Sequence, residues 1–136
     1  LQFLAICEPR LEVGRAEHYR CRLKFHSLLH NSMGTIWFFF QENFFGSIIG
    51  ESPQHVSVRL SHDHIPESRV IVSFVHARCT SVERSELWAG LLRDSTSSDA
   101  WLVGGDFNVI LDADEKKGDG ILILLKLQSL GNLLMK

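Results

Sequence analysis

The chain has 136 residues, of which 45% are hydrophobic and 22% charged, and its formal net charge at pH 7 is −2. This length supports one hydrophobic core and excludes two ordinary domains. The small negative charge excludes a strongly basic coat for nucleic acid, so any contact with nucleic acid has to be local or assisted by a metal ion. Three widely spaced cysteines without a Cys-x-x-Cys pair indicate reduced thiols rather than a disulfide framework or a zinc site.

The first residues already belong to an apolar run, and they lack the charged start and the cleavage site of a signal peptide. No apolar stretch reaches the roughly 20 residues that a membrane span needs. We therefore expect a fragment that begins within a domain, from an intracellular protein without membrane contact.

Short apolar runs predict strands in the first half of the chain. The run over residues 2–7 ends at Glu8 and Pro9, and a strand should stop there because proline cannot donate to a ladder. The spacing of apolar residues over 15–23 predicts a helix. Further strands are expected at 35–40, 45–49 and 55–60, followed by a polar turn over 62–68.

The second half reads as strand, helix, strand. Residues 70–75 are mostly β-branched and predict a strand. Thr80 and Glu83 have the spacing of a capping box, with the carboxylate reaching back to the Thr80 amide, so a helix should begin at Ser81. Its expected buried stripe consists of Val82, Leu87, Trp88 and Leu91. A strand over 101–103 then completes a unit that is typical of an α/β sheet. In the Leu-rich tail over 121–136, four apolar residues have helical spacing: Ile123, Leu127, Leu130 and Leu134.

The most informative motif is the Gly-Gly-Asp-Phe-Asn that ends the last strand. Along an extended backbone Asp106 and Asn108 point the same way, while Phe107 turns back to the core. The open end of a sheet is where α/β proteins tend to build active sites. A carboxylate beside an amide suits a phosphate, a water molecule or a hard cation such as Mg²⁺.

The order of these motifs resembles a known family. Ile6-Cys7-Glu8 ends a first strand, 70–77 leads to Glu-Arg-x-x-Leu-Trp over 83–88, and 101–108 precedes Asp-Glu-Lys-Lys-Gly over 114–118. Together they resemble the endonuclease/exonuclease/phosphatase superfamily, and within it the endonuclease domain of plant LINE-type (non-LTR) retrotransposons. The resemblance covers residues 1–118, a partial domain, and leaves 119–136 as a divergent tail.

The resemblance implies an α/β (α+β) fold, namely an incomplete four-layer α/β/β/α sandwich of the deoxyribonuclease I type. It also implies a Mg²⁺- or Mn²⁺-dependent hydrolase that cleaves phosphodiester bonds, with DNA as its substrate and the nucleus as its location if it is expressed.

Four residues match the site of that family by position. Glu8 stands where the family binds its metal ion, and Asp106 stands where the family orients or deprotonates the attacking water. Asn108 matches the residue that contacts the scissile phosphate. His76 replaces a tyrosine, and a histidine can still donate a hydrogen bond to phosphate.

Other parts of the family pattern are missing. The family carries an asparagine on a strand before the first one here, and nothing after Asn108 matches its second acidic ligand or its closing Asp-His pair. Because electrostatic groups act together, such a chain should have low or no activity. Whether it is an enzyme stays open, and two alternatives remain: a phosphatase of the same superfamily, and a non-catalytic folded remnant or binding module.

Three further features have simpler interpretations. His62, Asp63 and His64 are expected to form an exposed turn rather than a metal site, since no third ligand is nearby. The aromatic run over 37–40 predicts a strand buried on both faces rather than a base-stacking surface. The basic residues between Arg10 and Lys24 are interrupted by Glu12 and Glu17, which favours a solvated helix face over a DNA groove.

Overall fold

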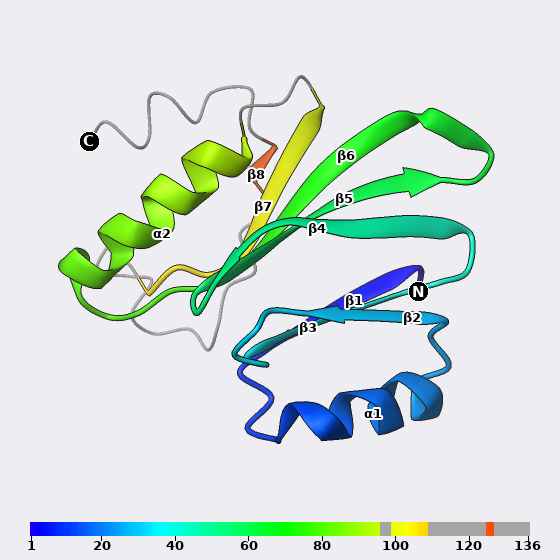
Figure 1. Ribbon diagram of the computed structural model, residues 1–136, viewed down its shortest axis with the longest axis horizontal. Coiled ribbons are helices and arrows are strands. Elements are labelled where there is room, and N and C mark those ends of the chain that lie inside the picture. The colour runs from blue at the N-terminus through cyan, green and yellow to red at the C-terminus, as the bar shows by residue number, and fades with distance from the viewer. Residues whose placement is uncertain (96–98, 109–124, 127–136) are drawn as a thin grey trace.

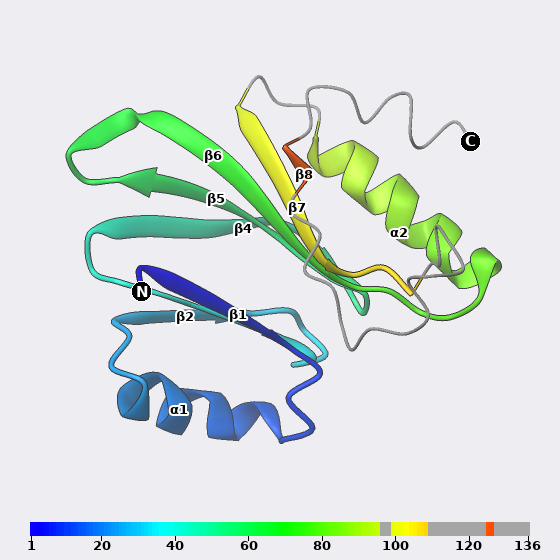
Figure 2. The same cartoon turned by 180° about the vertical axis from the view of Figure 1, so that it is seen from behind.

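The computed structural model describes residues 1–95, 99–108 and 125–126, and these form an α+β fold with two sheets and two helices (Figure 1). The two sheets lie against each other, and each helix lies near one of them, as the reverse view also shows (Figure 2). The α+β content expected from the sequence is therefore confirmed.

The first sheet has three antiparallel strands in the order β1-β3-β2. Its strands are β1 (Phe3–Cys7), β2 (Ser27–His30) and β3 (Ile36–Phe40). The predictions over 2–7 and 35–40 are confirmed, whereas β2 was not predicted. Its four residues, Ser-Leu-Leu-His, contain no β-branched residue and are too short to carry a periodic signal.

The second sheet has five strands in the order β4-β5-β6-β7-β8. Its strands are β4 (Phe44–Ser52), β5 (His55–His62), β6 (Ile65–His76), β7 (Ala100–Asp106) and β8 (Leu125–Lys126). The β6–β7 pair is parallel and the other pairs are antiparallel. Parallel pairing brings the carboxyl ends of β6 and β7 to the same edge of this sheet.

The turn expected over 62–68 is shorter in the structure. Strand β5 continues to His62 and β6 begins at Ile65, so only residues 63–64 connect them. The β5–β6 register shifts between Ser61 and His62, at the end of the ladder next to this turn.

Helix α2 (Ser81–Asp94) begins where the capping motif predicts, and the Thr80 hydroxyl accepts a hydrogen bond from the Glu83 main-chain N–H at 3.3 Å. The reciprocal bond differs from the expected one. The Glu83 carboxylate accepts from the Thr80 hydroxyl at 2.6 Å and from Arg78 at 3.2 Å, and these bonds lower the pKa of Glu83. Inclusion of Val82 in the buried stripe is wrong: its side chain is 78% exposed, and the sheet contact is made by Leu87 and Leu91.

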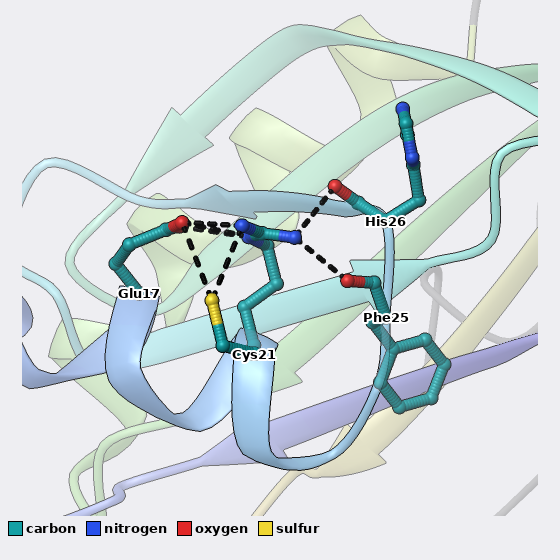
Figure 3. Close-up of polar contacts among 5 residues, drawn as sticks. Glu17, Cys21, Phe25 and His26 are labelled. Carbon is teal, nitrogen blue, oxygen red and sulfur yellow. Dashed lines mark hydrogen bonds and ion pairs between the residues drawn. The ribbon is translucent and has the colours of Figure 1, made fainter.

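A short 3₁₀ helix (Val13–Arg15) leads into α1 (Ala16–Arg22), within the predicted range. Hydrogen bonds from Arg20 connect the end of this helix to Phe25 and His26 in the chain that follows (Figure 3). The Arg20 guanidinium donates to the carbonyls of Phe25 at 2.8 Å and His26 at 3.0 Å, and also to the Glu17 carboxylate. The Arg20 side chain therefore stabilises the local fold. The pKa of Glu17 is lowered mainly by the hydrogen bond between its carboxylate and Arg20.

Three apolar clusters fill the spaces between these elements. Between the two sheets, alternate residues of β3 (Ile36, Phe38 and Phe40) pack against β5 and β6. On the opposite face of β3, Trp37 and Phe39 pack against Ala16 of α1. A third cluster joins α2 to the five-stranded sheet. The prediction of a two-sided buried strand over 37–40 is confirmed.

The helix expected in the tail over 121–136 is wrong at residues 125–126, because these pair with β7 as a strand. The rest of that prediction lies outside the described residues. In the described part of the chain, no helix has the length and apolar character needed to cross a membrane.

Candidate functional site

Three strand ends meet at one edge of the molecule. Strand β1 ends at Cys7, directly before Glu8, while β6 ends at His76 and β7 at Asp106. In the parallel register His76 lies opposite Asp106. The Nε2 atom of His76 also lies 3.6 Å from Oε2 of Glu8. Residues far apart in the sequence, from both sheets, therefore converge here.

Glu8 is held in place by its backbone. Its main-chain N–H donates to the carbonyl of Thr35 at 2.7 Å, and its φ angle is +51°. A non-glycine residue in this left-handed region is uncommon, and such strain clusters at functional sites. The side chain is 52% exposed, so its carboxylate is accessible to a ligand from solvent.

Asp106 and Asn108 are fixed by a set of short hydrogen bonds. The Asn108 main-chain N–H donates to Oδ1 of Asp106 at 2.9 Å, and the Asn108 side-chain amide donates to the carbonyl of Ala77. In the other direction, Ala77 N–H donates to the main-chain carbonyl of Asp106 at 2.7 Å. These bonds tie the residues after β7 to the residues after β6.

Arg84 adds a second tie that sequence reasoning missed. Its Nη1 atom donates to the carbonyl of Asn108 at 3.2 Å and to those of Arg78, also at 3.2 Å, and Cys79. The first turn of α2 thus contacts both loops of the site. The Glu-Arg-x-x-Leu-Trp motif marked this arginine, but a motif alone does not reveal which carbonyls it binds.

Gly105 allows β7 to approach β6 closely enough to form this edge. Its φ angle is +138°, and a Cβ atom there would lie 2.0 Å from the main-chain oxygen of Val75. Glycine alone adopts this backbone without strain and leaves that space free. The second glycine of Gly-Gly-Asp-Phe-Asn is therefore required by the geometry of the site.

Cys7 lies beneath the site rather than in it. Its thiol is directed at the carbonyl of Val75, with Sγ 3.7 Å from that oxygen. Burial, together with the negative charge of Asp106, raises the pKa of Cys7 to about 11. The sulfur is therefore a neutral thiol at neutral pH and is not prepared to act as a nucleophile.

The carboxylates at this edge suit a metal ion that keeps several of its waters better than one that is surrounded by protein ligands. Within the ranges 1–95, 99–108 and 125–126, no three His, Cys, Asp or Glu side chains form a group that could hold a metal ion. The carboxylates of Glu8 and Asp106 are exposed and supply hard oxygens. Mg²⁺ commonly binds one or two carboxylates, keeps several waters and completes its shell with substrate phosphate, so these residues fit that mode.

The polar side chains of the His62-Asp63-His64 segment contact one another and Asn43. His62 Nε2 lies 2.9 Å from the side-chain nitrogen of Asn43, and His62 Nδ1 lies 3.2 Å from the carboxylate of Asp63. His64 is 3.9 Å from the same carboxylate. The polar side chains of this segment are thus in contact with one another and with the residue that precedes β4.

The structure brings all four candidate residues together: Glu8, His76, Asp106 and Asn108. The chain after Asn108, except for β8, lies outside the described residues. This part consists of 109–124, which includes the basic pair at 116–117, and 127–136. A scan against profiles of protein families found no match to this chain. A search of curated protein sequences found no match either.

Proposed function

We propose that this chain is a partial metal-dependent phosphodiesterase domain of the endonuclease/exonuclease/phosphatase type, derived from a plant retrotransposon and of low or no activity. DNA is its proposed substrate and the nucleus its proposed location. The observation that carries the proposal is the convergence of Glu8, His76 and Asp106 from three strand ends.

The arrangement of layers supports the same proposal. Helix α1 packs on one face of the three-stranded sheet, and the other face packs against the five-stranded sheet. Helix α2 packs on the far face of that second sheet. We propose that this is the four-layer α/β/β/α sandwich of the deoxyribonuclease I fold.

The side chains have roles that suit phosphodiester hydrolysis. The Glu8 carboxylate would hold Mg²⁺ or Mn²⁺, which when bound neutralises phosphate charge and acidifies a coordinated water. Asp106, whose side chain accepts from Asn108 N–H, would take a proton from the attacking water. His76 supplies a ring N–H beside Glu8, where it can donate to a phosphate oxygen.

One observation favours the alternative of a non-catalytic remnant. The side-chain amide of Asn108 donates to Ala77, although the proposed role requires a donor aimed at phosphate. Likewise, His76 and Glu8 contact each other. In a remnant, these polar groups would satisfy one another and bind nothing.

Nicking of supercoiled plasmid in Mg²⁺ or Mn²⁺ tests the proposal, with Asp106→Ala as the site variant. Asp63→Ala is the matched control, because Asp63 is a partly exposed aspartate in the β5–β6 turn. Metal-dependent nicking that is lost by at least about 100-fold in Asp106→Ala and kept in Asp63→Ala supports a nuclease. Equal background in all three proteins supports the remnant, and release of phosphate from small monoesters without nicking supports a phosphatase.

A further inference from the structure

The turn between β4 and β5 reaches both halves of the proposed site. Its three successive carbonyls, those of Ser52, Pro53 and Gln54, each accept a hydrogen bond from a distant segment. The donors are the Asn31 side-chain amide at 3.0 Å, the Thr35 hydroxyl at 3.3 Å and the His76 main-chain N–H at 2.8 Å. The first two lie in the turn between β2 and β3 of the three-stranded sheet, and the third is the last residue of β6 in the five-stranded sheet.

Thr35 connects this turn to Glu8. Its hydroxyl binds the carbonyl of Pro53, while its own carbonyl accepts the Glu8 N–H at 2.7 Å. The buried side chain of Asn31 fixes Thr35, accepting from its main-chain N–H at 2.9 Å and donating to its hydroxyl at 2.9 Å. A shift of the turn would therefore be transmitted to the backbone of Glu8.

Gln54 connects the same turn to His76 and to α2. Its side chain is buried, with the residue only 4% exposed, and both ends of the amide are used. Oε1 accepts from Arg78 N–H at 2.8 Å, and Nε2 donates to the carbonyl of Glu83 at 2.9 Å. With the main-chain bond to His76, one residue holds the end of β6, the following loop and the start of α2.

The turn is rigid enough to serve as a reference point. The hydroxyl of Ser52 accepts from Gln54 N–H at 3.1 Å and lies 2.7 Å from Nδ1 of His55. The opposite ring nitrogen of His55 lies 2.9 Å from Asp94 at the end of α2. Buried polar networks in which every member has a partner hold a single geometry.

We propose that Gln54 is a positioning residue for the candidate site, which fixes His76 relative to Glu8 across the two sheets. The activity of the site in this inference rests on the proposed function. The positioning of His76 relative to Glu8 does not depend on that function. Gln54 contacts no reacting group. Its side-chain amide holds the loop that follows His76 and the start of α2. This amide keeps the Gln54 main-chain carbonyl on the N–H of His76, in a turn that holds Glu8 by way of Thr35.

The test compares Gln54→Met, which keeps the side-chain length and removes the amide, with the wild-type chain. The readouts are the NMR signals of the His76 imidazole, assigned by their loss in His76→Gln, and the Mn²⁺ concentration that half-broadens them. We expect the His76 signals to move and Mn²⁺ affinity to fall by about 10-fold to 100-fold, as for other groups that orient ligands.

Ser57→Ala is the matched control. The hydroxyls of Ser57 and Ser73 lie 2.6 Å apart in the middle of β5 and β6, and both residues are fully buried. Loss of that bond should lower stability without moving the His76 signals. If Ser57→Ala moves the His76 signals as much as Gln54→Met does, the signals report a general loss of rigidity in the fold, and the proposal fails.

Thr35→Val provides a second variant in case Gln54→Met does not fold. It preserves side-chain shape and removes the bonds of the hydroxyl to Pro53 and to Asn31, so it should also move the His76 signals. Unchanged signals in a folded Thr35→Val or Gln54→Met chain would overturn the positioning role. A wild-type chain whose His76 signals are not broadened by Mn²⁺ would instead refute the proposed metal site, while the signal positions would still decide the role of Gln54.

Discussion

His76 and Glu8 meet at 3.6 Å between Nε2 and Oε2, although His76 ends β6 and Glu8 follows β1, which belong to different sheets. Both side chains are partly exposed, so solvent screens the attraction between them. The contact therefore matters more for where it places two functional groups than for how much it stabilises the fold. The rigid backbone around each residue, rather than this contact, keeps them together.

A double-mutant cycle of Glu8→Gln and His76→Gln should give a small coupling energy. We expect about 0.2 to 1 kcal/mol, the range of exposed ion pairs. Urea unfolding of the two single variants and the double variant at pH 6 measures it. A coupling above about 2 kcal/mol would mean that the pair is shielded from solvent and is itself a structural element.

Replacement of Gly105 should be among the most damaging single changes in the chain. An added Cβ would lie 2.0 Å from the Val75 oxygen, on a backbone with a φ angle of +138°. Gly105→Ala is expected to cost about 3 to 5 kcal/mol, measured by urea unfolding.

Gly14→Ala is the control for that change, because a Cβ at Gly14 would meet no atom within 4 Å. It should leave stability within about 1 kcal/mol of the wild type, with a gain favoured by the loss of unfolded-state freedom. Equal effects of the two substitutions would contradict the close approach of β7 to β6.

Two of the four apolar residues of α2 that the sequence grouped together should behave differently. Leu87 is fully buried against the sheet, so Leu87→Ala should destabilise by about 2 to 5 kcal/mol. Val82 is 78% exposed, so Val82→Ala should change stability by no more than about 0.5 kcal/mol. Thermal melts of both variants measure the difference, and a large loss in Val82→Ala would show that α2 is rotated from its described position.

Stability should fall in mild alkali because of Cys7. The folded-state pKa is raised to about 11 from an ordinary value of 9.0, so folding favours the neutral thiol. The contribution of the neutral Cys7 thiol to the free energy of unfolding is fully present below pH 9 and is lost as the pH rises toward 11. The loss attributable to this group is about 2 to 3 kcal/mol.

The measurement is the pH dependence of unfolding free energy in the wild type and in Cys7→Ala, from pH 8 to pH 11. The exposed Cys21 and Cys79 are present in both proteins and cancel in the comparison. Parallel curves would show that Cys7 is accessible to solvent. Alkylation offers an independent check, since Cys7 should react much more slowly than the two exposed thiols.

Strong local signals in the sequence predicted much of the fold. The apolar runs before Glu8 and before Gly104, and the cap at Thr80, gave correct elements because each depends on neighbouring residues only. Strand β2 escaped prediction because only its pairing with β3 identifies it. Val82 was misplaced because apolar spacing does not determine which side of a helix meets the sheet.

The candidate site was predictable as a set of residues but not as a geometry. Asp106 and Asn108 carry a motif, and Glu8 ends an apolar run, so their residue types pointed to polar chemistry. The functions of Gln54 and Arg84 depend on main-chain carbonyls from distant segments. No local pattern encodes such partners, because any glutamine or arginine could bind any exposed carbonyl.

The contact between the Cys7 thiol and the Val75 carbonyl spans 68 residues of sequence. Contacts of such separation form late in folding, because a long loop must close before they yield any stabilisation. The α2–β7 unit and the β4–β5–β6 hairpins can collapse while β1 is still undocked. A refolding chain would thus regain most of its secondary structure before Glu8 reaches His76, and any affinity that depends on this pair would return only in the slowest kinetic phase.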